Sequence, residues 1–288
     1  MIENKKPRTL VNIIGAPLLL TAIYIGGPLF TLLIFVIIFI GTFEFNNMIK
    51  TKSYSINLFI FYFIYSIFFF NHLLIQMSAS EIQYGLLFFP LHGSQYSFFI
   101  FFSFLIIALS SIFTSNKSKY KNLMYGILAF VWIGILFQGA IFLRDLPEIG
   151  LKIVFCMFVS VWVTDSFAFI FGSRYGKSKI LPSVSPNKTW VGFIAGYIAC
   201  AMFIYFFYKF DYFKRSLYLI TISDIIFLGI ISGIFGQFGD FFESYLKRSF
   251  SLKDSGNLLQ GHGGFLDRFD SLLFVAPLFY CYYYYFLL

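Results

Sequence analysis

Long apolar segments separated by short polar stretches run through the whole chain. Segments such as residues 29–40 are continuously hydrophobic and do not alternate with polar residues, which is typical of helices rather than of membrane barrel strands. A helix of about 20 residues crosses the hydrocarbon layer of a bilayer, which is about 30 Å thick. The pattern predicts an all-α, polytopic integral membrane protein with about nine spans, at residues 10–26, 28–45, 54–76, 97–113, 122–143, 152–171, 189–208, 217–239 and 269–288.

We expect the spans to form one membrane-embedded domain over residues 1–288. Residues 1–150 would supply N-terminal transmembrane helices, and residues 151–288 the catalytic helices and loops. The first apolar run follows a basic stretch, but no small-residue cleavage site precedes the next run, so we expect a retained helix rather than a signal peptide. Gly26-Gly27-Pro28 predicts a tight break after this run, giving either two short spans or a re-entrant pair.

Composition agrees with a membrane protein. Hydrophobic residues make up 59% of the chain and charged residues 12%, about half the charged fraction of a typical soluble domain. Cys156, Cys200 and Cys281 all lie in apolar runs without paired spacing, so neither a disulfide framework nor a zinc site is expected.

The distribution of basic residues predicts the orientation in the membrane. With the N-terminus in the cytoplasm, 16 of the 21 Lys and Arg residues fall on the cytoplasmic side, which fits the positive-inside rule. Because these residues flank membrane segments, the net charge of +8 does not indicate a nucleic-acid partner. The same orientation puts the loops at 172–188 and 240–268 on the cytoplasmic face. We therefore expect a cytoplasmic-face active site in a bacterial-type inner membrane.

Charge is concentrated in residues 239–271, which carry nine charged side chains. If residues 240–247 are helical, Asp240, Glu243, Ser244 and Lys247 share one face. Such a stripe forms ordinary salt bridges on a soluble helix. Here it continues an apolar helix, where a charge near the bilayer centre costs about 2.5–3.5 kcal/mol, so we favour a functional interpretation.

The end of this stretch suggests metal and phosphate binding. Asp267 and Asp270 either cap the last helix or, together with Asp240, supply oxygen ligands for Mg²⁺. Arg268 between them suits bidentate phosphate binding. The glycines at 261–264 would let backbone N–H groups approach an anion. His262 serves either as a general base or as a structural hydrogen-bonding residue.

The other predicted cytoplasmic loop is also basic and rich in small residues. Its Lys188 suits a phosphate-bearing ligand, although such charge also sets topology. Asp165, inside the preceding apolar run, is an intramembrane acid that either functions in the site or pairs with a neighbouring helix. Together the two loops predict phosphoryl or nucleotidyl transfer to a substrate held in the membrane.

At this point the residues resemble the phosphatidate cytidylyltransferase (CDP-diacylglycerol synthase) family. The C-terminal motif of that family matches Gly239-Asp240, Glu243-Ser244, Lys247-Arg248, Lys253-Asp254, Gly256 and His262-Gly263-Gly264-Phe265-Leu266-Asp267-Arg268-Phe269-Asp270. A second motif matches Asp165, Ala168-Phe169, Gly172, Gly176-Lys177, Ser185-Pro186 and Lys188-Thr189-Trp190. Asn187, Val191 and Gln260 depart from the family pattern. The motifs cover the C-terminal half, whereas the N-terminal half is similar only in hydropathy.

The resemblance implies that CTP and phosphatidic acid react in the presence of Mg²⁺ to give CDP-diacylglycerol and pyrophosphate, a step of phospholipid biosynthesis. We assign metal binding to Asp240, Asp267 and Asp270, and a catalytic role to these three and Lys247. Substrate binding is assigned to Lys188, Ser244, Arg248, Lys253, His262, Gly263, Gly264 and Arg268.

Other functions and partners follow from the same residues. The nearest alternative is a CTP-dependent kinase of polyprenols or other lipid alcohols, which would release CDP. A transporter with a carboxylate relay is a further alternative, but its charges should lie at the midplane and show repeat symmetry. Expected partners are CTP, phosphatidic acid and bilayer lipids, with a homodimer as a possible assembly.

Overall fold

The computed structural model describes residues 9–77, 94–112, 118–210, 212–213, 221–256, 258 and 263–287. These residues form helices joined by turns and include no β-strand beyond one isolated bridge between Lys179 and Thr189. The predicted all-α class is therefore confirmed. The chain divides into two compact units, which consist of Met1–Asp145 with Asp254–Leu266, and of Leu146–Lys253 with Asp267–Leu288.

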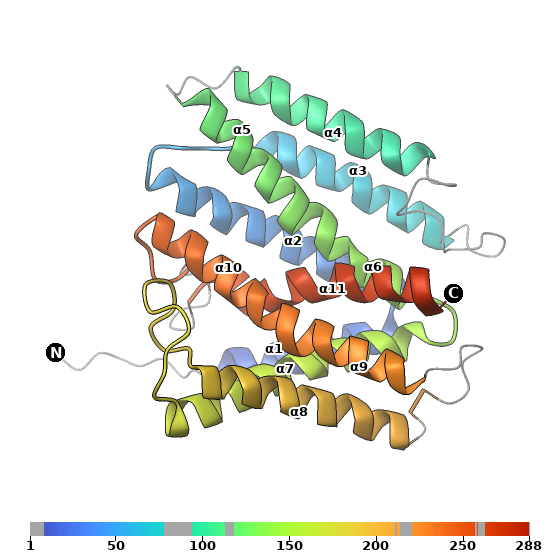
Figure 1. Cartoon of the computed structure of the whole chain (residues 1–288). Coiled ribbons are helices and arrows are strands. Elements are labelled where there is room, and N and C mark those ends of the chain that lie inside the picture. The colour runs from blue at the N-terminus through green and yellow to red at the C-terminus, as the bar shows by residue number, and fades with distance from the viewer. Residues whose placement is uncertain are drawn as a thin grey trace. The chain divides into compact units, whose positions relative to one another are not determined.

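The first unit is built from antiparallel helices. They are α1 (Thr9–Ile25), α2 (Gly27–Lys50), α3 (Leu58–Met77), α4 (Ser94–Ile112) and a continuous run of α5 (Lys119–Leu128), a π-helical segment (Ala129–Ile135), a 3-10 turn (Leu136–Gln138) and α6 (Gly139–Arg144). Helix α3 packs on α2, and α4 packs on α5 (Figure 1). Gly26 and Gly27 have positive φ angles of 69° and 53°, so the tight break predicted here is confirmed.

The second unit holds most of the predicted site residues. Its helices are α7 (Gly150–Tyr175), α8 (Trp190–Lys209), a continuous run of α9 (Ile222–Ile230), a π-helical turn (Ile231–Phe235) and α10 (Gly236–Ser249), and finally α11 (Asp270–Tyr282), which continues into a π-helical turn (Tyr283–Leu287). The π-helical turn between α9 and α10 is surrounded by other helices. Ser232 bonds to Ser160 of α7 at 2.8 Å, and Gly233 lies against Tyr197 of α8.

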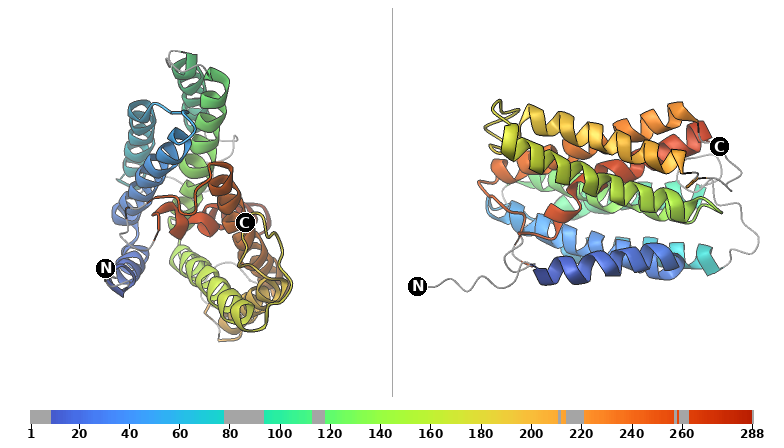
Figure 2. Two further views of the ribbon diagram at one scale, coloured as in Figure 1. Left: turned by 90° about the vertical axis from the view of Figure 1, so that its left-hand side faces the viewer. Right: turned by 90° about the horizontal axis from the view of Figure 1, so that it is seen from below.

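Helices α7 and α8 lie side by side along their length (Figures 1 and 2). Glycines permit this contact, because a Cβ atom at Gly192 or Gly196 would lie 2.6 Å or 2.8 Å from a backbone oxygen of α7. Small residues one turn apart bring membrane helices together in the same way. Thr189 begins α8 by accepting a hydrogen bond from the Gly192 N–H at 3.2 Å. The loop between α7 and α8 therefore starts and ends at the same end of this helix pair.

Within the part of the chain that the structure describes, six helices or helical runs are long and apolar enough to cross a membrane, by length and composition. They are Gly27–Lys50, Leu58–Gln76, Lys119–Arg144, Gly150–Tyr175, Trp190–Lys209 and Ile222–Ser249. Each overlaps a predicted span, but Ile222–Ser249 continues ten residues past the predicted end at 239, so the charged face of α10 is part of this helical run. The predicted spans at 10–26, 97–113 and 269–288 are also helical in the described residues, but their crossing of the membrane stays a prediction.

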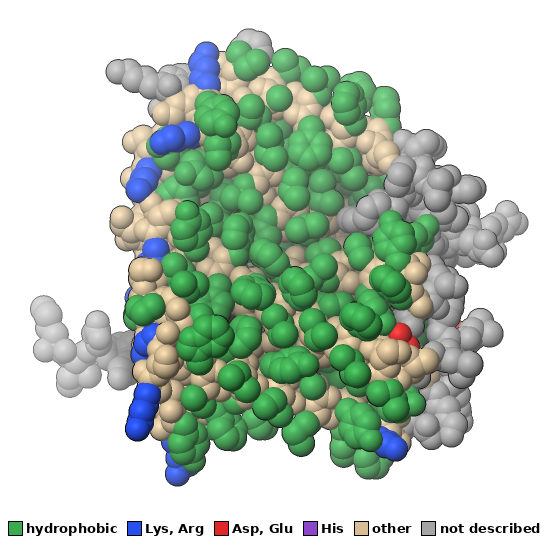
Figure 3. Space-filling model, viewed as in Figure 1, with side chains coloured by type: hydrophobic (Ala, Val, Ile, Leu, Met, Phe, Trp, Pro, Cys, Tyr) green, Lys and Arg blue, Asp and Glu red, His purple; other side chains and the backbone are tan. Residues whose placement is uncertain are grey.

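The surface agrees with a lipid environment. The face drawn in Figure 3 is covered largely by hydrophobic side chains, and large apolar residues such as Phe59 and Phe169 are 79% and 75% exposed. Apolar surface of this extent marks contact with lipid or protein rather than with water. Together with the spanning helices, this surface identifies an integral membrane protein.

Two further sequence predictions have different outcomes. Cys156, Cys200 and Cys281 are all free thiols, as expected, and the first two are buried. The basic N-terminal stretch with Lys5, Lys6 and Arg8 lies outside the described residues.

Candidate active site

One face of α10 carries the predicted row of polar side chains. The Ser244 hydroxyl donates to Asp240 Oδ1 at 3.4 Å, and Lys247 Nζ lies 3.2 Å from Glu243 Oε2. Both pairs are one helical turn apart, which confirms that these four residues share a face. Glu243, Ser244 and Lys247 are buried within the second unit, so the row faces protein at most of its positions.

Lys247 is held between two carboxylates. Its Nζ atom lies 2.5 Å from Oδ1 of Asp267, in addition to its contact with Glu243. A buried ammonium needs such compensation, because removing a charge from water costs more than a single contact returns. Asp267 and Lys247, both predicted as catalytic residues, are therefore brought together and neutralise each other.

Lys188 joins the loop before α8 to α10. Its Nζ atom lies 2.6 Å from Asp240 Oδ2 and 4.1 Å from the centre of the Phe241 ring. The two side chains are 25% and 33% exposed, although the Nζ atom of Lys188 itself is buried against Asp240. The predicted loop at 172–188 therefore meets helix α10, which carries the first charged residues of the second polar stretch, within the second unit.

Three further carboxyl groups lie near this ion pair, and we call Asp165, Glu243 and Asp270, together with Asp240, the acidic cluster. The Asp270 carboxyl lies close enough to the carboxyls of Asp240 and Glu243 for their charges to interact. Asp165 experiences the charges of Asp240, Asp270 and Lys188. Carboxylates at such separations favour the binding of a proton or a cation.

Close packing of α10 against α11 puts Asp270 in this position. A Cβ atom at Gly239 would lie 2.6 Å from the Asp270 backbone oxygen and 3.0 Å from Cα of Ser271. Only glycine allows the first turn of α11 to approach α10 this closely. The neighbouring Asp240 is thereby placed beside Asp270.

The donor set suits a hard cation such as Mg²⁺. In the described part of the chain no three His, Cys, Asp or Glu side chains converge tightly enough to hold a metal ion on their own. Mg²⁺ commonly takes one or two carboxylates and completes its shell with waters and substrate phosphates. Asp240 and Asp270 provide such a pair, whereas the third predicted ligand, Asp267, contacts Lys247.

The predicted phosphate-binding residues differ in their surroundings. Arg248 donates from Nε to the Val184 carbonyl at 3.1 Å and from Nη1 to the Leu252 carbonyl at 2.7 Å, so it ties two loops together. Lys253 and Arg268 are exposed. All three remain candidates for contact with substrate phosphates.

The glycine-rich segment belongs to the first unit. Gly263 has a φ angle of 80°, a conformation that favours glycine, and Gly264 is buried. The described part of this segment surrounds the carboxylate of Glu44 on α2, which the sequence interpretation did not single out. Glu44 is nevertheless the only charged residue in the apolar run at 28–45. A lone charge in a membrane segment indicates a residue with a specific role, so the sequence does contain a signal that points to Glu44. His262 and Gly261 lie outside the described residues.

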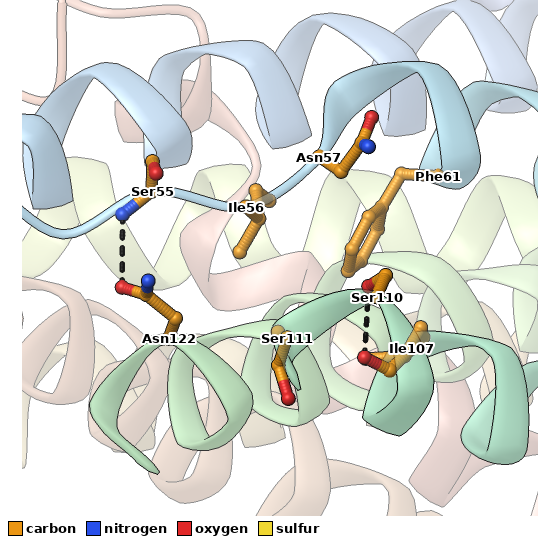
Figure 4. A pocket seen from close by; sticks show the side chains of 9 residues that line it. Ser55, Ile56, Asn57, Phe61, Ile107, Ser110, Ser111 and Asn122 are labelled. Carbon is orange, nitrogen blue, oxygen red and sulfur yellow. Dashed lines mark hydrogen bonds between the residues drawn. The ribbon is translucent and has the colours of Figure 1, made fainter. Parts of the chain in front are cut away.

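A small pocket elsewhere in the first unit is of a different kind (Figure 4). It lies between the start of α3, the end of α4 and α5. Ser110 and Asn122 are among its lining residues, and the Ser55 N–H donates to Asn122 Oδ1 at 3.1 Å. Because its lining contains no ionisable side chain, it offers no group for phosphate or metal chemistry.

Comparison with known proteins gives a match over nearly the whole chain. The profile described as the Cytidylyltransferase family matches residues 6–286. A protein named phosphatidate cytidylyltransferase from Bacillus subtilis (strain 168) is 34% identical over 278 residues, which cover 96% of this chain and 97% of the relative. Proteins of the same name from Staphylococcus saprophyticus and Staphylococcus haemolyticus are each 33% identical and cover 95% of this chain and 96% of their own length. The chain therefore belongs to the cytidylyltransferase family.

Proposed function

We propose that this protein transfers the cytidylyl group of CTP to phosphatidic acid and releases CDP-diacylglycerol and pyrophosphate. The contact of Lys188, in the loop before α8, with Asp240 of α10, a member of the acidic cluster, carries this proposal structurally. The site combines anionic oxygens for a cation with basic groups for phosphates, as a metal-assisted nucleotidyl transfer requires. The names of the relatives supply the same reaction.

In the reaction, an oxygen of the phosphatidate phosphate attacks the α-phosphorus of CTP in line with the departing β-phosphate. The new O–P bond forms as the α–β bridge bond breaks, and pyrophosphate carries away the leaving electron pair. The nucleophile is already an anion, so the chain need not supply a strong general base. Positioning of the phosphates and neutralisation of their charge are therefore the main tasks of the protein.

Individual residues are assigned to these tasks. Asp240 and Asp270 would hold Mg²⁺, which supplies charge neutralisation for the triphosphate when it is bound. Lys188, which contacts Asp240, would bind a substrate phosphate. Exposed Lys253 and Arg268 would add further positive charge. Buried Lys247 would offset part of the negative charge of Glu243 and Asp267.

We further propose that the protein lies in the inner membrane and that its site is on the cytoplasmic face. The loop before α8 and the end of α10 lie together, as the Arg248–Val184 hydrogen bond shows, and both carry basic residues. Lys209 is at the opposite end of α8, about 30 Å away along a 20-residue helix. The positive-inside rule assigns the more basic end to the cytoplasm, where CTP is made.

Product analysis tests the reaction. Purified protein in detergent micelles that contain phosphatidic acid should convert CTP into CDP-diacylglycerol and pyrophosphate, and chelation of divalent cations should stop the conversion. A lipid-alcohol kinase would instead release CDP and leave phosphatidic acid unchanged. Release of CDP without CDP-diacylglycerol, or full activity in excess chelator, would overturn the proposal or its metal requirement, respectively.

A further inference from the structure

Arg248 bonds to two backbone carbonyl groups rather than to an acid. Its Nε atom donates to the Val184 carbonyl at 3.1 Å, and its Nη1 atom donates to the Leu252 carbonyl at 2.7 Å. Leu252 lies just beyond the end of α10, whereas Val184 lies 64 residues before Arg248, in the loop between α7 and α8. Among the described residues no carboxylate pairs with the guanidinium. Arg248 therefore acts as a planar double donor that joins this loop to the end of α10.

The loop between α7 and α8 is internally hydrogen-bonded and also carries Lys188. The Val184 and Ser185 N–H groups donate to the Leu181 carbonyl at 3.1 Å and 2.9 Å and close a turn within the loop. The Ile180 N–H donates to the Lys188 carbonyl at 3.2 Å and joins the two arms of the loop. Because Lys188 follows Val184 by four residues, the bond from Arg248 restrains the backbone that directs this lysine.

In the described part of the chain, one ion pair and one hydrogen bond join this loop to α10. They are the ion pair of Lys188 with Asp240 and the bond of Arg248 to Val184. The ion pair consists of two groups that are proposed to bind phosphate and metal, so it cannot be relied on to hold the loop while those ligands are bound. The bond from Arg248 uses a backbone carbonyl to which the proposed reaction assigns no ligand. It can therefore persist while the substrates are bound.

We propose that Arg248 is a positioning residue, which anchors the loop between α7 and α8 to α10 and thereby keeps Lys188 beside the acidic cluster. This inference rests on the proposed function, in which Lys188 binds a substrate phosphate. A positive charge stabilises a reacting phosphate best when it is already held in place, because a mobile side chain must first be ordered. Arg248 supplies that order through Lys188, whereas the sequence motif alone assigns Arg248 to the substrate itself.

A double-mutant cycle of Arg248→Lys and Lys188→Met tests this role in the full-length protein in detergent. Lysine keeps a positive charge for a phosphate, but its ammonium does not reproduce the planar pair of donors that bonds the two carbonyls. We expect Arg248→Lys to lower kcat/KM for CTP about tenfold, as for the loss of one hydrogen bond from a charged group. In the Lys188→Met background the same change should cost less than about twofold, because Arg248 acts through Lys188. A residue that bound the substrate independently would cause the same loss in both backgrounds.

Hydrogen exchange measures the anchoring without turnover. In Arg248→Lys, peptides from residues 178–188 should exchange faster than in the wild type, whereas peptides from the interior of α8 should not change. A general loss of stability would speed exchange in both segments. Arg174→Lys is the matched control, because Arg174 lies near the end of α7 and contacts the neighbouring Tyr175 ring, 5.6 Å from its centre. This control should leave both activity and exchange unchanged.

Three results would overturn the inference. They are an equal fall in kcat/KM in both backgrounds, wild-type activity in Arg248→Lys, and exchange of residues 178–188 that is unchanged or rises together with that of α8. If the wild type itself forms no CDP-diacylglycerol, the proposed function fails instead, and the exchange measurement still decides whether Arg248 anchors the loop.

Discussion

Lys188 Nζ lies 2.6 Å from Asp240 Oδ2, so a lysine assigned to substrate phosphate forms an ion pair with an aspartate assigned to metal. The pair is partly exposed, and the ion pair itself contributes at most about 1 kcal/mol to stability. Its arrangement instead suggests an exchange of partners. A cation would take Asp240 and a phosphate would take Lys188 when the substrates arrive.

Replacement of Lys188 should therefore damage activity far more than stability. For Lys188→Met we expect kcat/KM for CTP to fall by about 100-fold or more, since a preorganised positive charge at the phosphates is lost. The thermal midpoint in detergent should change by only a few degrees. Activity assays and thermal unfolding of the same preparation check this prediction. A large fall in the midpoint would instead assign Lys188 a structural role.

Asp270→Ala should abolish CTP turnover while the protein stays folded. Its carboxyl lies in the acidic cluster beside Asp240, and removal leaves a single carboxylate of the proposed metal-binding pair. Turnover is measured with phosphatidic acid and labelled CTP, and folding by size-exclusion chromatography in detergent. Near-wild-type turnover would remove Asp270 from the site.

Lys209→Ala should be nearly silent. Lys209 ends α8, whereas Lys188 precedes the start of the same helix, so this change removes a positive charge at the far end from the site. We expect activity within about twofold of wild type, as for most surface substitutions. A large loss of turnover would contradict the proposed location of the site.

Gly239→Ala should impair both packing and activity. The added Cβ would lie 2.6 Å from the Asp270 backbone oxygen and would push α11 away from α10. Overpacking of this kind costs about 1–3 kcal/mol, and Asp270 would move away from Asp240. Gly229→Ala is the matched control in the same helical run, because its Cβ would have only ordinary contacts at 3.5 Å and 3.6 Å with Ala201. Thermal unfolding and turnover should separate the two variants, and equal behaviour would refute the close-approach argument.

The buried acid Asp145 should make the stability of the first unit depend on pH. Burial raises the pKa of Asp145, although the Gln76 amide, which donates to its Oδ2 at 2.9 Å, and Arg144 lower it. The folded state therefore favours the protonated carboxyl. Its contribution to stability is fully present below the unfolded pKa, about 3.9, and is lost as pH rises through the folded pKa.

The neutral variant Asp145→Asn tests this dependence. Because asparagine resembles the protonated acid, we expect its thermal midpoint to rise relative to wild type as the pH increases from about 4 to about 8. Thermal unfolding in detergent at several pH values measures the difference. A difference that is constant with pH would show that the Asp145 carboxyl has the same pKa in the folded and unfolded states.

Hydrophobic patterning made the helices predictable, because continuous apolar runs have few alternatives in a bilayer. The polar face of α10 followed from helical periodicity alone, since Asp240, Glu243, Ser244 and Lys247 are separated by single turns. The break at Gly26 followed from local backbone chemistry. In each case the relevant partners lie within a few residues of one another.

The contacts of Glu44 and Arg248 were not predictable in this way. The partners of Glu44 are more than 200 residues distant, and no local pattern pairs an acid on α2 with a glycine-rich segment. Arg248 carries a charge that suits phosphate, but its guanidinium also bonds two backbone carbonyls that only the folded chain brings near. The sequence indicates which side chains are able to bind a phosphate, a metal ion or a backbone group. Tertiary packing determines which of these groups come into contact.

The π-helical turn at Ile231–Phe235 has a consequence for how the chain tolerates length changes. Each residue of a helix turns the following ones by about 100°, and a π turn accommodates one residue more than a regular turn. Loss of a residue elsewhere between α9 and Asp240 would swing the carboxylates of α10 toward lipid. If one residue is deleted within the π-helical turn, the turn becomes a regular α-helical turn and the orientation of α10 does not change. A deletion at this position therefore leaves the carboxylates directed at the site.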